Sequence, residues 1–143
     1  MAFYTYNILQ MSILLSVDYL FQNRIMGPRD HPNLEEKISQ LNKEVSQNPE
    51  KNHLRIGLAK AYLKDNRNEE ALAELETAIK TNPKDCNALR LLGSTAMALG
   101  KYERALEEFK SVLEIDPNDS AANHQLGVLY DRLGRYDDAI TLY

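Results

Sequence analysis

The side chains of this chain that could carry chemistry are few and scattered. Its histidines are His31, His53 and His124, and no two of them lie three or four residues apart, as metal-binding pairs on a helix do. Cys86 is the only cysteine, so the chain can form neither an internal disulfide nor a cysteine cluster for zinc. We therefore predict no metal site and no cofactor, and nothing in the cysteine content indicates an oxidising compartment.

Catalytic patterns are also missing from the sequence. The glycines form neither a phosphate-binding loop nor a dinucleotide fingerprint, and no Gly-x-Ser-x-Gly sequence is present. Carboxylates are abundant, as in the pairs 69–70 and 107–108, but charges such as Arg104 and Glu108 stand four residues apart, which is typical of a solvated helix face. We therefore predict no catalytic residues and no enzyme activity.

The composition is that of a folded, acidic protein of one domain. Of the 143 residues, 43% are hydrophobic and 27% are charged, which is globular rather than disordered composition. The net charge of −4 argues against nucleic acid as the partner, because nucleic-acid binding normally requires a basic surface.

A period of about 34 residues runs through the chain and decides which elements position these side chains. Pro49, Pro83 and Pro117 follow one another at this single spacing. Five further columns keep the same spacing: Ala71, Ala105 and Ala139; Leu58, Leu92 and Leu126; Gly93 and Gly127; Gly100 and Gly134; Tyr102 and Tyr136. The agreement of independent columns predicts an array of structural repeats.

Each repeat predicts two helices joined by a short turn. The first helix is expected over 52–65, 86–99 and 120–133, and the second over 68–81, 102–115 and from 136 onward. Gly100 should end the first helix of its repeat with a positive φ, and Pro117 cannot continue the second. Asp85 and Asp119 stand where a side-chain oxygen can cap the next helix.

The pattern resembles the tetratricopeptide repeat. The residues that carry the resemblance are Leu89, Leu92, Gly93, Ala105, Phe109 and Pro117 in the middle repeat, and Leu126, Gly127, Tyr130, Ala139 and Tyr143 in the third. The first repeat departs from the pattern, with Arg55 where a large apolar residue is usual and Ala59 where glycine is usual. Over residues 52–143 the resemblance implies an all-α fold, a right-handed α-solenoid of helix-turn-helix repeats with the divisions 52–85, 86–119 and a partial 120–143.

Two segments precede the repeats. Leu34, Ile38, Leu41 and Val45 lie on one face of a helix, so 33–47 is expected to form a single helix that caps the start of the stack. Residues 1–31 form a leader whose uncharged run, Met1 to Val17, is shorter than the roughly 20 residues of a membrane span. Three alternatives stay open: a soluble or non-native leader with Met26 as the true start, a helix packed on the stack, or a membrane anchor within 1–26.

The chain stops at Tyr143, inside the last expected helix and without a polar capping helix. Terminal units of repeat stacks need such a cap because they otherwise expose an apolar face. We therefore expect a fragment of a longer protein that self-associates weakly through this end.

The resemblance implies that a peptide or helix of another protein binds the concave face, which the first helices form. By helical spacing the candidate residues are Ile56, Lys60, Leu63, Lys64, Arg90, Ser94, Met97, His124, Val128 and Arg132. Their mixture of apolar and basic side chains suits a partner with apolar and acidic side chains. The alternative that the true binding surface lies in further repeats stays open.

The sequence favours a scaffold or adaptor that binds proteins, but not one that binds the C-terminal carboxylate of heat-shock chaperones. Members of the family that bind chaperone tails use lysines, asparagines and an arginine at positions that here hold Ile56, Lys60, Leu91, Ala121 and Gln125. Two other functions stay open: a regulatory or substrate-docking arm of a larger enzyme, such as a glycosyltransferase or methyltransferase, and a membrane-tethered assembly factor.

Overall fold

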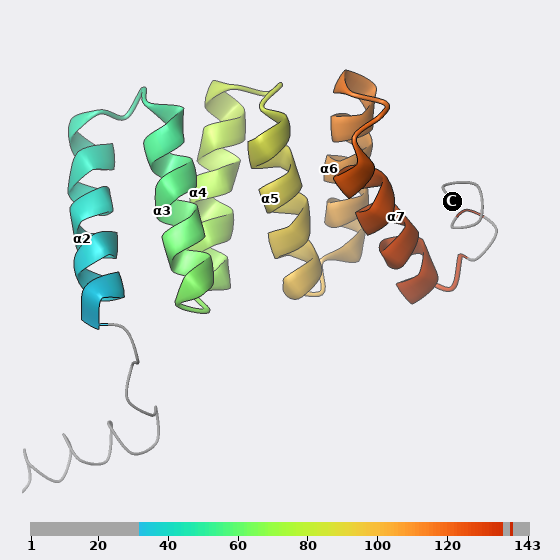
Figure 1. The fold of residues 1–143 in the computed structure, drawn as a ribbon, viewed down its shortest axis with the longest axis horizontal. Helices are drawn as coiled ribbons and strands as arrows, with labels where there is room; N and C mark the ends of the chain where they lie inside the picture. Colours follow the sequence, from blue (N-terminus) through green and yellow to red (C-terminus); the bar gives the residue numbers. More distant parts are fainter. Residues whose placement is uncertain (1–31, 136–137, 139–143) are drawn as a thin grey trace, which may run out of the picture. The chain divides into compact units, whose positions relative to one another are not determined.

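The structure, a computed structural model, describes residues 32–135 and Asp138. All of the regular structure in these residues is helical (Figure 1): α2 Pro32–Gln47, α3 Asn52–Lys64, α4 Asn68–Thr81, α5 Cys86–Ala98, α6 Tyr102–Ile115 and α7 Ser120–Arg132. The first helices of the repeats end one residue earlier than the period predicted. The leader 1–31 and, apart from Asp138, the helix expected from residue 136 lie outside the described residues.

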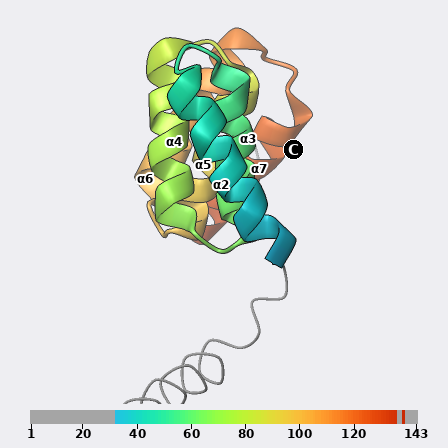
Figure 2. The same ribbon diagram turned by 90° about the vertical axis from the view of Figure 1, so that its left-hand side faces the viewer.

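The helices stack as consecutive antiparallel hairpins in two layers. Helix α3 packs on α4 and α5 on α6 within hairpins, while α4 packs on α5 and α6 on α7 between them. Figure 2 shows α4 and α6 in one layer and α3, α5 and α7 in the other. This arrangement within the compact unit Glu36–Tyr143 confirms the predicted all-α solenoid.

The two helices of the second hairpin approach closely at Gly93 of α5 and Phe109 of α6. A Cβ atom at Gly93 would lie 2.9 Å from the Phe109 ring, closer than a carbon atom can approach. Ala59 and Leu75 take these positions one repeat earlier, and both are fully buried. Ala59, where the family pattern has glycine, is thus accompanied by a side chain smaller than phenylalanine.

Individual residues with a positive φ or a capping side chain determine where the helices end and begin. Gly100 and Gly134 have φ values of 71° and 68°, which confirms the expectation for Gly100, and Asn66 takes the same place in the first hairpin with a φ of 58°. Asparagine tolerates this left-handed conformation better than most residues. Asp85 accepts hydrogen bonds from the backbone N–H groups of Asn87 and Ala88, so the predicted cap of α5 is also confirmed.

Helix α2 covers the first hairpin with one apolar side. Ile38 and Val45 are 4% and 7% exposed, and Leu41 lies over Gly57 of α3, where a Cβ would meet its Cδ2 atom at 3.8 Å. The Asn42 amide also donates a hydrogen bond of 3.0 Å to the Tyr62 hydroxyl. The exposed residues of α2 are polar: Asn33, Glu35, Glu36, Lys37, Ser39, Gln40, Asn42, Lys43, Ser46 and Gln47. Such a helix presents little apolar surface on its outer side.

Candidate functional site

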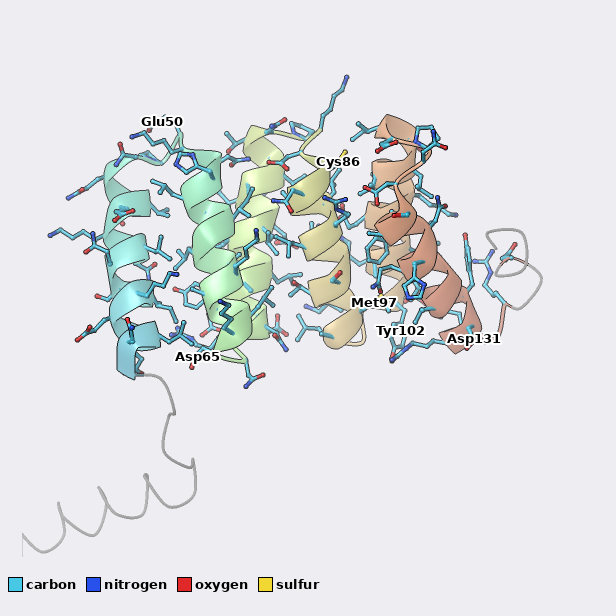
Figure 3. All side chains as sticks on the ribbon, in the orientation of Figure 1. Glu50, Asp65, Cys86, Met97, Tyr102 and Asp131 are labelled. Carbon is cyan, nitrogen blue, oxygen red and sulfur yellow. The ribbon has the colours of Figure 1, made fainter. Side chains whose placement is uncertain are left out.

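The exposed side of α3, α5 and α7, here called the first-helix face, carries most of the predicted partner-binding residues. Lys60, Lys64, Ser94, His124 and Arg132 are exposed, and Leu63, Arg90, Met97 and Val128 are half-buried. Figure 3 shows the side chains of this layer, including Met97 on α5 and Asp131 on α7. Because residues three and four apart lie on one side of a helix, these side chains form rows across the three helices.

Ile56 does not belong to this exposed set, although its spacing predicted that it would. The side chain is 7% exposed and lies in a buried cluster with Ala78 of α4 and Ala88 of α5. Ile79 and Leu91 pack against the same cluster. The second hairpin therefore covers Ile56, and this apolar side chain contributes to the stacking of hairpins rather than to a surface.

Arg90 is on the first-helix face but is not a free cation. Its Nη1 atom lies 2.6 Å from Oδ2 of Asp119, which precedes α7 in the next hairpin. The other oxygen, Oδ1, accepts the backbone N–H of Ala122 at 2.8 Å, so Asp119 also caps α7 as predicted. One carboxylate thus joins the cap of α7 to a side chain of α5.

The unpaired cations of this face are Lys60, Lys64 and Arg132. None of the three has an ion pair within the described part of the chain, and all are exposed. The other described arginines, at positions 55, 67, 90, 104 and 135, each pair with a carboxylate. Arg132 is therefore the one guanidinium among residues 32–135 without an ion pair.

Between the cations of α3 and α7, helix α5 presents short side chains. Ser94 and Ala98 are both exposed, and they stand one repeat after Lys60 and Lys64 and one repeat before Val128 and Arg132. In a repeat array, residues that differ by one period occupy adjacent places on neighbouring units. The centre of the face therefore combines small side chains with charged ones on either side.

Several carboxylates of α4 and α6, the opposite layer, pair with nearby basic side chains. Arg104 of α6 lies 2.6 Å from Glu108 and 3.4 Å from Glu76 of α4, and Lys101 lies 3.3 Å from Glu69. The hydrogen bond to Glu108 raises the pKa of Arg104, and the hydrogen bond from Arg67 lowers the pKa of the Glu70 carboxyl. These contacts favour ionised carboxylates, whereas a general acid needs a raised carboxyl pKa.

Two further kinds of site, a metal centre and a membrane-spanning helix, have no counterpart in the described residues. Over residues 32–135, no three side chains of His, Cys, Asp or Glu are grouped closely enough to hold a metal ion. None of the helices in the same range has the length and apolar character needed to cross a bilayer. The proposed membrane anchor within 1–26 lies outside the described residues.

Comparison with known proteins identifies the repeats. The tetratricopeptide repeat family model matches residues 56–120 and 92–143, so the overlapping matches span more than half of the chain. A crystal structure of MamA, 20% identical, superposes with a TM-score of 0.74 over 85% of this chain and 68% of its own. The first tetratricopeptide domain of Spaghetti (RPAP3), solved with the HSP90 peptide SRMEEVD, is 25% identical, with a TM-score of 0.68 over 71% of this chain and 81% of its own. No curated protein sequence matches.

The family model matches the part of the chain that forms the stacked hairpins. The buried glycine and alanine positions of the repeat lie inside these hairpins. The chain belongs to the tetratricopeptide repeat family.

Proposed function

We propose that this chain is a protein-interaction scaffold or adaptor that binds a peptide or helix of a partner protein on its first-helix face. The observation that carries the proposal is the contrast between the two layers. Helices α3, α5 and α7 carry five Lys and Arg residues and one carboxylate, Asp131, whereas α4 and α6 carry eight carboxylates and three Lys and Arg residues. Of the basic residues on the first-helix face, Lys60, Lys64 and Arg132 have no ion pair among the described residues.

The apolar side chains of the face supply a second contribution to binding. Leu63, Met97 and Val128 are half-buried, so each retains apolar surface that a partner can remove from water. Removing such surface from water favours association by about 25 cal/mol per Å², before the entropic cost of binding is subtracted. Exposed cations add mainly to the rate and selectivity of association. A segment with both apolar and acidic side chains fits this combination.

The RPAP3 domain was solved with a peptide of HSP90, which supports a protein segment as the class of ligand. The sequence SRMEEVD is an unsuitable ligand for this chain, however. Ile56 is buried, Leu91 is half-buried, and Ala121 is apolar, at positions where binding of a chaperone tail requires polar or charged side chains. We therefore propose a partner other than a chaperone tail.

Photocrosslinking from the centre of the face tests the proposal. A photoreactive amino acid replaces Ser94 in one variant and, as a matched control, Glu107 of α6 in another, since both side chains are exposed and in helices. We expect the photoreactive residue at position 94 to crosslink a partner protein. An excess of the unmodified protein should compete for that partner and suppress the crosslink. Crosslinking of the same partner from both positions, or from position 107 alone, would contradict the proposal.

A further inference from the structure

The first-helix face holds one cation in a fixed orientation. The Arg90 guanidinium donates to Oδ2 of Asp119 at 2.6 Å, while Oδ1 of the same carboxylate accepts the N–H of Ala122 at 2.8 Å. The Asp119 side chain is only 6% exposed, so solvent competes little for either oxygen. The backbone of α7 therefore fixes the carboxylate, and the carboxylate fixes Arg90.

Arg90 keeps hydrogen-bond donors beyond those that Asp119 accepts. A guanidinium carries five N–H donors in a planar fork, and one nitrogen atom, Nη1, serves Asp119. Within the described residues Arg90 makes no other hydrogen bond, and its side chain is 38% exposed. The remaining donors are thus accessible, and because the side chain is already ordered, a ligand would lose less conformational entropy on binding it.

The charge around Arg90 is still favourable for an anion. Asp119 offsets one positive charge, but it stands at the first turn of α7, where the helix dipole contributes roughly half a positive charge. Lys60 and Lys64 on α3 and Arg132 on α7 add cations to the same face. Asp131 of α7 is the one carboxylate on α3, α5 and α7, so a carboxylate that approaches this face meets more basic side chains than acidic ones.

We propose that Arg90, held in place by Asp119, anchors a carboxylate of an acidic segment in the partner protein. The inference rests on the proposed function and specifies the partner's chemistry: glutamate or aspartate beside apolar residues. Asp119 acts as a positioning residue, because it reaches the ligand only through Arg90. Neither residue is among the five positions that correspond to the binding of chaperone tails.

The chain contains its own control for this arrangement. Asp85 caps α5 as Asp119 caps α7, with Oδ1 accepting two backbone N–H groups at 3.1 Å. The residue one repeat before Arg90 is the buried Ile56, so Asp85 has no arginine in the corresponding place. Asn in place of either Asp keeps an oxygen for the cap, but at position 119 it turns a donor NH₂ group toward the guanidinium.

The probe is a fluorescein-labelled peptide of alternating glutamate and leucine, and a second peptide has glutamine in place of glutamate. We expect the glutamate peptide to bind at least about tenfold more tightly, because hydrogen bonds to charged groups are the stronger ones. Arg90→Gln should remove most of this preference. Asp119→Asn should raise the dissociation rate about threefold, whereas Asp85→Asn should leave it unchanged.

Several results would overturn the proposal: equal binding of both peptides, unchanged preference in Arg90→Gln, or equal effects of Asp119→Asn and Asp85→Asn. If Arg90→Gln unfolds, Arg90→Lys keeps the charge beside Asp119 but loses the planar fork, and the preference should still fall. If both peptides bind equally but the photoreactive residue at position 94 still crosslinks a partner, the role of Arg90 as an anchor is wrong and the proposed function stands. Should neither peptide bind and position 94 give no crosslink, the proposed function fails as well.

Discussion

Gly93 shows how a single atom constrains a repeat. A methyl group there would meet the Phe109 ring at 2.9 Å. We predict that Gly93→Ala lowers the free energy of unfolding by about 1–3 kcal/mol through overpacking, although alanine favours the helix by about 1 kcal/mol. Adding Phe109→Leu should recover part of the loss, as Ala59 and Leu75 coexist in the first repeat. Urea denaturation of the four proteins of this double-mutant cycle measures the coupling.

The matched control is Gly57→Ala, because a Cβ there meets only Leu41, at 3.8 Å. This change should be neutral or stabilising by up to about 1 kcal/mol. Equal destabilisation by Gly57→Ala and Gly93→Ala would show that glycine acts through its backbone freedom and not through the contact with Phe109.

Charge reversal separates Arg90 from the other cations of the first-helix face. Arg90→Glu places a like charge beside the nearly buried Asp119, so we predict a loss of about 1–3 kcal/mol in unfolding free energy; this range allows for the partial exposure of Arg90. The double change Lys60→Glu and Lys64→Glu should stay within about 0.5 kcal/mol, as exposed residues without partners do. Thermal unfolding followed by circular dichroism compares the two, and similar midpoints would refute the role of the Arg90–Asp119 pair.

At the scale of single residues, the sequence predicted those features that depend only on residues close by in the chain. The caps Asp85 and Asp119 and the turn at Gly100 depend on neighbours within a few residues, and all three were predicted. The pair of Arg90 and Asp119 joins residues 29 positions apart in different hairpins, and the burial of Ile56 depends on how the next hairpin covers it. Neither could be derived from helical spacing alone. The positive φ of Asn66 was not predicted, because this position of the repeat was identified only from the glycines Gly100 and Gly134.

Among the elements, α2 offers a direct test of how one helix is held by its neighbour. Ile38 is 4% exposed on the side of α2 that meets the first hairpin. We predict that Ile38→Ala, a change that typically costs about 2–5 kcal/mol in a core, speeds amide exchange in α2 far more than in α5 and α6. In repeat proteins, each unit is stabilised mainly by its neighbours. Lys37→Ala on the exposed side is the control, and equal acceleration in α5 and α6 would contradict this local role.

The helix boundaries could be predicted because two periods coincide in the sequence. The spacing of the repeats fixed where each helix falls, and the spacing of three and four residues fixed which side is buried. Helix α2 belongs to no complete repeat, yet its apolar residues at Leu34, Ile38, Leu41 and Val45 marked it. The ion pair between α4 and α6, Glu76 with Arg104, was not predicted, since charged residues on exposed sides follow no period.

For the whole molecule, the period begins after residue 31, and we predict that the folded unit does not need the leader. Deleting residues 1–31 should leave the helical content per residue of the remainder and the thermal midpoint within a few degrees of the full chain. A control deletion of residues 1–47, which also removes α2, should lower the midpoint, because it uncovers the apolar side of α3. A large fall already on deletion of 1–31 would contradict this prediction and favour a leader that packs on the stack.

The fold of the whole unit followed from the sequence, but the identity of its partner did not. Repeats specify their own stacking through buried residues such as Leu58, Leu92 and Leu126, which recur at one period. Residues on the first-helix face, such as Lys60, Ser94 and Val128, differ from repeat to repeat because stacking places little demand on them. The apolar and basic side chains of this face indicate the class of ligand, a segment with apolar and acidic side chains, and do not specify the sequence of that segment.

Acetylation of lysines in the presence of the partner that crosslinking identifies tests the central claim most directly. Lys60 and Lys64 lie on the first-helix face, and Lys80 and Lys110 lie on the opposite layer; all four are exposed, and none has an ion pair among the described residues. Quantitative mass spectrometry gives the acetylation rate of each lysine with and without the partner. We predict that the partner slows acetylation of Lys60 and Lys64 and leaves the acetylation rates of Lys80 and Lys110 unchanged. Protection of Lys80 and Lys110 with Lys60 and Lys64 unaffected would contradict it.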